Sequence, residues 1–286
     1  MCILLVAAGP LPELQAPKLQ LVLAFNRDEA FARPTEPLHV WEDGILAGRD
    51  MRGGGTWFGV APGGRIAALT NNWGHERLNA PTRGTLVLDF LRSGDSVDTF
   101  ISHISGRASE MSGFNLLVGE SLNGVWRLRS FSNVEQRAAD LPPGIHGIGN
   151  GPITDEWPRV SVGKAALRAA LQQSSAAISQ EAMFEALRSE YSSGAPVIPG
   201  AGESSSSMRN ARQSLFIPPL AEIGTRSSSV CLIHQDGRIE IEERTYDRSG
   251  ISVHAAVGWI KPDEVPVAIP VGVLPVSRAI KSGFDR

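Results

Sequence analysis

Cysteine is scarce in this sequence of 286 residues, which contains only Cys2 and Cys231. Two cysteines form no disulfide framework, and their scarcity fits a reducing compartment. The apolar run at the start ends at Gly9-Pro10, so it is too short to span a membrane. No basic segment precedes that run, as one would in a secretory signal. We therefore predict a cytoplasmic protein without a membrane span.

An excess of charge of one sign is also missing. The sequence has 27 lysines and arginines against 30 aspartates and glutamates, and its net charge is −3. Nucleic-acid-binding proteins usually carry a basic domain or stripe, so we predict no nucleic-acid partner. No set of histidines, cysteines and carboxylates has the spacing of metal ligands, and the sequence contains no Cys-x-x-Cys-His motif. We therefore expect no metal site and no required cofactor, while the oligomeric state stays open.

The length of the chain allows one large domain. A chain of 286 residues buries enough surface to fold without disulfides or metals. We therefore predict a single domain over residues 1–286. The Ser- and Gly-rich stretch at 192–212 is expected to be a flexible insertion, and the proline-rich tail from about Pro262 is expected to be irregular.

Apolar runs and turn residues indicate several hairpins and few helices. Cys2–Ala8 and Leu19–Phe25 are typical of buried strands, and Asn123-Gly124 marks a hairpin tip. This pattern differs from the alternation of strands and helices in a doubly wound sheet. It predicts an α+β fold in which helices cover antiparallel sheets. Hairpins are expected over residues 56–69, 114–131 and 228–244, and helices over Thr85–Leu91, Val97–Ile104, Trp157–Leu171 and Glu181–Tyr191.

Cys2 is the first candidate for chemistry. Initiator methionine is normally removed when the second residue is small, and its removal would leave Cys2 with both a thiol and a free α-amine. Because such an amine has a reference pKa of about 7.7–8.0, it can act as an internal base for the thiol, as in N-terminal nucleophiles. The plainer alternative is a small, buried, inert side chain.

Four consecutive polar residues, Asn26-Arg27-Asp28-Glu29, follow the second apolar run. An antiparallel hairpin of the first two strands would place Arg27 and Asp28 beside Cys2. There Arg27 would lower the pKa of the thiol and hold it as thiolate, while Asp28 could orient the α-amine. The alternative is a strand end exposed to solvent, where an Arg–Asp pair adds little stability.

Two asparagines and an arginine lie near the ends of other predicted strands. Asn71, followed by Asn72, and Asn150, between two glycines, could each donate a hydrogen bond to an oxyanion. One such donor is worth about 3–4 kcal/mol of transition-state stabilisation, although asparagine is also a favoured turn residue. Arg226, ahead of the last hairpin, is either a surface charge or a second cation at the site.

These motifs together resemble the NRDE family, which is named for its tetrapeptide and includes the transport and Golgi organisation protein of animals. The resemblance extends over roughly residues 1 to 245 in matching order. It rests on Met1-Cys2, Asn26–Glu29, Arg33-Pro34, Gly54–Gly59, Ala68–Asn71, Arg83-Gly84, Gly113–Leu116, Trp157–Arg159 and Gly224–Arg226.

The resemblance implies the fold of N-terminal nucleophile hydrolases, a four-layer αββα sandwich with two stacked antiparallel sheets. The similar cysteine amidases, which cleave bile-salt conjugates and penicillin V, use a terminal cysteine, an arginine and aspartate soon after it, two asparagines and a later arginine. In those amidases the arginine and aspartate are three residues apart, whereas here they are adjacent, so Asn26 and Glu29 become further candidates. The matching catalytic residues are Cys2, Arg27, Asp28, Asn71, Asn150 and Arg226.

The resemblance therefore implies a hydrolase that acts on an amide or related acyl bond of a small molecule. Trp57 and Trp73 could form an apolar wall for the acyl group, although core packing is an equal alternative for Trp57. Family members have been linked to haem trafficking and lipid homeostasis, so a carrier of haem or another apolar, lipid-like ligand is the alternative. A third hypothesis is a scaffold with an inert Cys2. The candidate substrate-binding residues are Asn26, Glu29, Trp57, Asn72 and Trp73.

Overall fold

The computed structural model describes residues 2–11, 19–173, 179–189, 214–220, 222–261 and 265–271. Within these ranges the strands form two seven-stranded antiparallel sheets. The first sheet contains, in spatial order, β10 (Gly144–Ile148), β1 (Cys2–Ala8), β2 (Leu19–Ala30), β11 (Ile223–His234), β12 (Ile239–Tyr246), β13 (Ser252–Ile260) and β14 (Val267–Pro270). The second contains β3 (Thr35–Val40), β4 (Leu46–Asp50), β5 (Phe58–Ala61), β6 (Arg65–Asn71), β7 (Phe114–Leu122), β8 (Val125–Ser132) and β9 (Arg137–Asp140).

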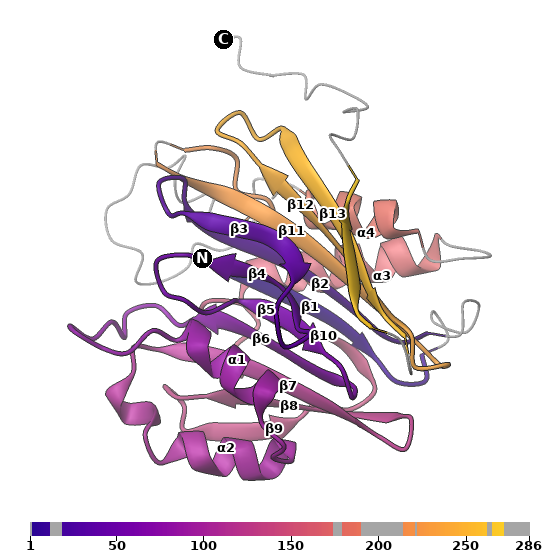
Figure 1. The fold of residues 1–286 in the computed structure, drawn as a ribbon. Helices are drawn as coiled ribbons and strands as arrows, with labels where there is room; N and C mark the ends of the chain where they lie inside the picture. The colour runs from indigo at the N-terminus through magenta and orange to yellow at the C-terminus, as the bar shows by residue number, and fades with distance from the viewer. Residues whose placement is uncertain are drawn as a thin grey trace.

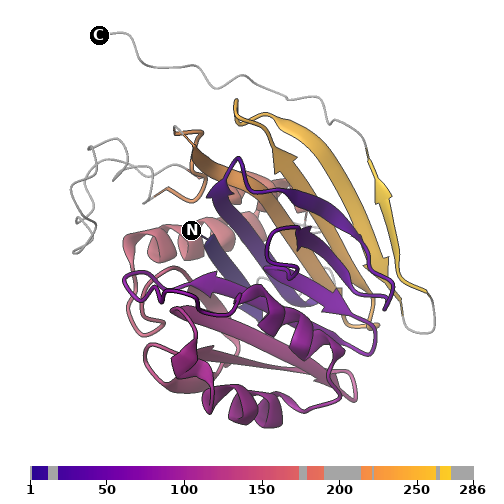
Figure 2. The same ribbon diagram turned by 60° about the vertical axis from the view of Figure 1, so that its left-hand side comes forward.

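Helices cover the outer face of each sheet (Figures 1 and 2). Helices α1 (Gly84–Arg92) and α2 (Val97–Ser105) contact the second sheet, and a short 3-10 helix, Ala108–Glu110, follows them. Helices α3 (Pro158–Gln172) and α4 (Gln180–Leu187) contact the first sheet. The molecule is thus a four-layer αββα sandwich, which confirms the predicted fold class.

Both faces of the central strands are buried, and alternation along each strand separates two cores. On β1, Leu4 and Val6 belong to the core between the sheets, together with Phe25 and Phe58. Ile3 belongs instead to the core beneath α3 and α4. A third cluster lies between α1, α2 and the second sheet. This alternation decides which core each residue of the site faces.

Local sequence signals explain several element boundaries. Helix α2 begins after Ser96, whose side chain accepts a hydrogen bond from the backbone N–H of Thr99, as favoured N-caps do. Pro158 occupies the first turn of α3, where its missing N–H is not needed. Asn123 and Gly124 have φ angles of 51° and 78°, which fit the predicted hairpin tip between β7 and β8.

Two predicted boundaries are wrong. Strand β2 does not end at Phe25 but continues to Ala30, because β1 and β11 pair with its polar half from both sides. The tail is not irregular throughout, since Val267–Pro270 pairs with β13 as an edge strand, a position that tolerates proline. The predicted insertion at 192–212 and the last part of the predicted fourth helix lie outside the described residues.

No helix within the described ranges is both long and apolar enough to cross a membrane. Several strands were not predicted from the sequence, namely β3, β4, β9 and β13.

Candidate functional site

Cys2 is the first residue of β1 and lies in the core between the two sheets, with 8% of its surface exposed. Its backbone N–H donates to Asn150 Oδ1 at 3.0 Å, and its Cα lies opposite that of Arg27 on β2. Burial raises the pKa of the Cys2 thiol, and this effect exceeds the opposing influence of Arg27. Arg27 thus acts on the pKa of the thiol in the predicted direction, and a thiolate after removal of Met1 stays a prediction.

Asn150, in the loop after β10, joins the start of β1 to the end of β6. Its Oδ1 accepts from Cys2, and its Nδ2 donates to the backbone carbonyl of Asn71 at 2.8 Å. Its own carbonyl accepts from the backbone N–H of Trp73 at 2.9 Å. The structure thus brings Cys2, Asn71 and Asn150 together, as predicted. Among the described residues, the side chain of Asn71 makes no hydrogen bond, so its amide is available as a donor.

Arg27 shares the face of the sheet on which Cys2 lies. Its Nη1 donates to Thr35 Oγ1 at 2.9 Å, and its guanidinium lies 4.2 Å from the ring centre of Trp57. Burial lowers the pKa of Arg27, while the charges of Glu29 and Cys2 oppose this shift. An arginine side chain stays protonated under such conditions. Arg27 therefore places a buried positive charge next to Cys2.

Arg226 reaches the same face through an irregularity in β11. Thr225 pairs with Asp28 and Ser227 with Arg27, so Arg226 is the extra residue of a β-bulge, a device that re-aims a side chain. Arg226 Nη1 donates to three backbone carbonyls at the end of β2 and just after it, those of Ala30, Phe31 and Arg33, at 2.9, 3.0 and 3.4 Å. A cavity of about 120 Å³ adjoins it, lined by Arg27, Thr35, Pro37, Arg226, Ser227, Thr245, Tyr246 and Val253.

Asn26 and Asp28 point to the opposite face of the sheet, toward the helices. Asp28 Oδ2 lies 2.5 Å from Arg159 Nη2 of α3, and Oδ1 accepts from Thr225 Oγ1 at 2.6 Å. Asn26 Nδ2 donates to the carbonyls of Leu187 and Leu215 at 2.9 and 2.8 Å, and its Oδ1 accepts from a serine hydroxyl of β11. The structure therefore does not bring the Asn26 side chain to Cys2. The charge of the Asp28 carboxylate raises the pKa of the Cys2 thiol, whereas a hydrogen bond from the Asp28 backbone N–H lowers it.

The other predicted substrate-binding residues mostly make contacts within the protein. Glu29 Oε2 lies 3.8 Å from Arg33 Nε. Asn72 is buried and donates to Asn115 Oδ1 at 3.4 Å. Trp73 packs its edge against Trp157, with ring centres 6.1 Å apart. Trp57 belongs to the core between the sheets, so the packing alternative holds for it, although one face of its ring meets Arg27.

Two arginines that the sequence analysis left out also belong to the site region. Arg159 is buried and donates to both Asp28 and the carbonyl of Leu215. Arg83 donates to the carbonyl of Gly113 at 2.9 Å, and the charge of Cys2 acts on the pKa of Arg83, which burial lowers. Both arginines stand in motifs that carry the family resemblance, which was the available signal.

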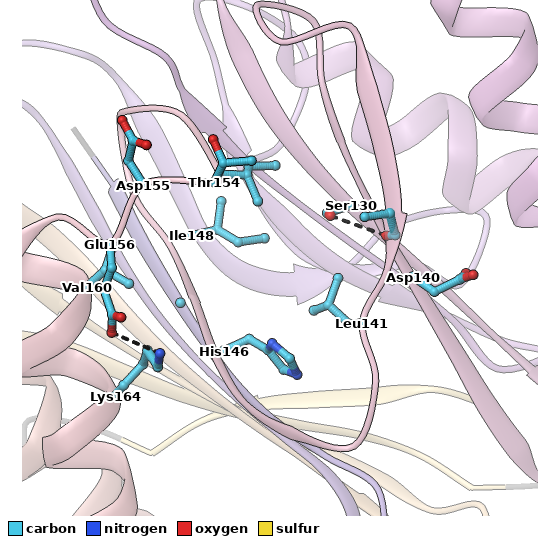
Figure 3. Close-up of a pocket in the computed structure, with 13 residues that line it drawn as sticks. Ser130, Asp140, Leu141, His146, Ile148, Thr154, Asp155, Glu156, Val160 and Lys164 are labelled. Atoms are coloured by element: carbon cyan, nitrogen blue, oxygen red, sulfur yellow. Dashed lines mark hydrogen bonds and ion pairs between the residues drawn. The ribbon is translucent and has the colours of Figure 1, made fainter.

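A larger cavity of about 300 Å³ lies apart from these residues. Figure 3 shows it between the β8–β9 and β10 strands and the loop before α3, with an ion pair between Glu156 and Lys164 at its wall. None of the predicted site residues lines it. In the parts of the chain that the structure describes, no three metal-ligating side chains come together.

The layers form an αββα sandwich with Cys2 at the start of its first strand. The family model for Transport and Golgi organisation 2 matches residues 1–248, so the chain belongs to this family, as the sequence analysis predicted. The Transport and Golgi organization protein 2 homolog of Bos taurus is 28% identical over 259 residues, which are 86% of this chain and 93% of that protein.

Two solved structures are similar in outline. The N-acylethanolamine-hydrolyzing acid amidase ortholog of Caenorhabditis elegans has 12% identity and a TM-score of 0.47, covering 80% of this chain and 92% of its own. A variant of the conjugated bile acid hydrolase from Clostridium perfringens has 10% identity and the same TM-score of 0.47, covering 94% and 92%.

Proposed function

We propose that this protein is an amidohydrolase of the N-terminal nucleophile type, with Cys2 as its nucleophile after removal of Met1. The observation that carries the proposal is the position of the Cys2 nitrogen, 3.0 Å from Asn150 Oδ1. Removal of Met1 would turn this nitrogen into an α-amine that Asn150 holds beside the thiol. Because the reference pKa of an α-amine is about 7.7–8.0, part of it is unprotonated at neutral pH and can accept the thiol proton.

In the proposed reaction the thiol proton moves to the α-amine as sulfur attacks the carbonyl carbon of an amide. The tetrahedral intermediate collapses when its C–N bond breaks, and the ammonium returns the proton to the leaving amine. Water, deprotonated by the same α-amine, then attacks the thioester. The C–S bond breaks, the carboxylic acid leaves and the thiol regains its proton.

Asn71, Asn150 and the two arginines have distinct proposed roles. The amide of Asn71, which makes no hydrogen bond among the described residues, would donate to the oxyanion, and Asn150 supports it through the backbone carbonyl of Asn71. Arg27 and Arg226 supply positive charge on the same face. Such donors and charges contribute most where water is excluded, and Cys2 and Arg27 are both buried.

Intact mass spectrometry before and after exposure to an activated acyl ester tests the proposal. The expected result is a chain that lacks Met1 and gains one acyl group, which Cys2→Ala loses. Cys231→Ala is the matched control, because Cys231 is fully buried and burial raises its thiol pKa far above the usual range. A chain that retains Met1, or equal acylation of Cys2→Ala, would refute the mechanism.

A carrier of haem or another apolar, lipid-like ligand is the alternative proposal. The observation that favours it is a further cavity of about 380 Å³, lined mostly by apolar side chains that include Leu21, Trp126 and Leu128. Haem titration should then give a saturable shift of the Soret band that persists in Cys2→Ala and is lost when Leu128→Lys places a charge in this cavity. An unchanged Soret band would count against the carrier.

The predicted cytoplasmic location stays a prediction, which cell fractionation can test.

A further inference from the structure

The cavity beside Arg226 lies on a row of residues that begins at Cys2. Across the first sheet, Cys2 pairs with Arg27, Arg27 with Ser227, and Ser227 with Thr245. Three of these four residues line the cavity, and the fourth is Cys2. Since neighbouring strands lie roughly 4.8 Å apart, the backbone of β11 is roughly 10 Å from that of β1. The cavity therefore lies roughly 10 Å from Cys2 along this row.

Two guanidinium groups face this cavity, and neither is neutralised directly. Among the described residues, Arg27 and Arg226 form no ion pair with a carboxylate. The charge of Glu29 acts on both arginines, but Glu29 and Asp50 each pair with Arg33, at 3.8 and 2.5 Å. The charge of Arg27 lowers the pKa of Arg226 further than burial alone does. The cavity thus concentrates positive charge that an anion would relieve.

Arg226 is also fixed in place before any ligand arrives. Its three hydrogen bonds to backbone carbonyls hold the guanidinium, and its buried Nε has no hydrogen-bond partner among the described residues. A buried donor without a partner costs about 1–3 kcal/mol, so the fold retains an unfavourable feature here. Because these bonds already hold the guanidinium, a ligand carboxylate can bind it without reorganising the side chain.

We propose that this cavity binds a carboxylate of the substrate, held by Arg27 and Arg226, while the reacting carbonyl lies at Cys2. The chemistry fits because guanidinium groups bind carboxylates through paired, charge-assisted hydrogen bonds. The cavity of about 120 Å³ is well below the range of roughly 300–1,000 Å³ for drug-sized ligands, so it suits a carboxylate better than a bulky headgroup. The substrate class is then an acyl compound with a carboxylate roughly 10 Å from the reacting carbon. The inference rests on the proposed function in one respect, the position of the reacting carbonyl.

Thiol reagents with arms of different length measure this geometry without requiring turnover. Iodoacetyl derivatives of glycine, 4-aminobutyrate and 6-aminohexanoate would be compared with the matching primary amides. The rate at which each reagent labels Cys2 would be measured by intact mass spectrometry. We expect the 6-aminohexanoate reagent to react about tenfold faster than its amide, because its eight bonds of roughly 1.2 Å span the distance. Arg226→Gln should abolish this preference, whereas Arg107→Gln, an exposed arginine that pairs with Asp89, should retain it.

Equal rates for acid and amide, or a preference that survives Arg226→Gln, would overturn the proposal. If Cys2 resists every reagent, thermal unfolding with hexanoate and with hexanamide decides instead. A saturable rise in Tm with hexanoate alone, absent in Arg226→Gln, supports the carboxylate site, and identical curves refute it. A carboxylate preference without any acyl-enzyme would leave this site standing while the proposed hydrolase fails, so the two failures are distinguishable.

Discussion

Neighbouring residues of the Asn26–Glu29 motif point to opposite faces of β2 and lie in different environments. On the helix side, Asn26 and Asp28 accept hydrogen bonds from α3 and β11, and Asn26 also donates to α4 and to the segment before β11. On the side between the sheets, Arg27 contacts Thr35 and Trp57 but no carboxylate among the described residues. The motif therefore combines a structural half, which holds the helices to the sheet, with a half that faces Cys2 and retains unsatisfied charge.

Breaking the buried ion pair on the helix side should have the largest effect. Arg159→Leu leaves the Asp28 carboxylate buried without its cation, which typically costs about 3–5 kcal/mol. Urea denaturation should show this loss as a lower midpoint. Arg92→Leu removes the partner of Asp43 in a pair whose side chains are 50% and 36% exposed, and such pairs contribute at most about 1 kcal/mol. Similar losses for both variants would show that the helix side does not stabilise the fold as argued.

Glu243 extends the comparison, because it is a buried acid on the side between the sheets. It accepts hydrogen bonds from Leu38 N–H and Ser229 Oγ, and Arg27 acts on it from the same face. Burial raises the pKa of Glu243 to about 7, well above its usual value of about 4.3. The folded state therefore holds the proton more tightly than the unfolded chain does.

The sign of the pH dependence follows from this difference. The stabilising contribution of protonated Glu243 is present in full below about pH 4.3 and is lost as pH rises through about 7. It amounts to roughly 4 kcal/mol, at 1.36 kcal/mol per unit of pKa shift. The free energy of unfolding should thus fall more steeply with rising pH in the wild type than in Glu243→Gln, which cannot ionise. Parallel pH profiles for the two proteins would contradict a raised pKa at this position.

The strands and the grouping of Cys2, Asn71 and Asn150 could be predicted from the sequence better than the orientation of the side chains. Cys2–Ala8 was predicted with its observed bounds because its apolar run ends at a glycine and proline. The continuation of β2 beyond Phe25 was missed, because polar residues point to both faces there and leave no alternating pattern. The partner of Asp28 is Arg159, 131 residues away, and the bulge at Arg226 depends on pairing with β2. Both are properties of the assembled sheet that local patterns do not encode.

Replacing Asn26 should lower the free energy of unfolding less than replacing Arg159 does, because Asn26 forms uncharged hydrogen bonds on the same helix side. Asn26→Ala leaves the carbonyls of Leu187 and Leu215 and the hydroxyl of Ser228 without this partner in a buried site. The expected cost is about 2–3 kcal/mol, since buried polar groups that lose partners cost about 1–3 kcal/mol. Denaturation with urea measures it, and Ser228→Ala, which removes one of the three bonds, should cost less. A neutral Asn26→Ala would place the residue outside the network.

Arg27 should show the smallest effect on stability and thereby separate the two faces most clearly. Arg27→Met removes a desolvated charge that has no carboxylate partner among the described residues, and apolar replacement of buried ions is often neutral or stabilising. Loss of the contact with Trp57, at 4.2 Å, opposes this gain by about 1–2 kcal/mol, so the free energy of unfolding should change by less than about 1 kcal/mol. The carboxylate preference in Cys2 labelling should nevertheless disappear. If Arg27→Met unfolded the protein as readily as Arg159→Leu, both faces of β2 would be structural, and the positive charge beside Cys2 would need no functional explanation.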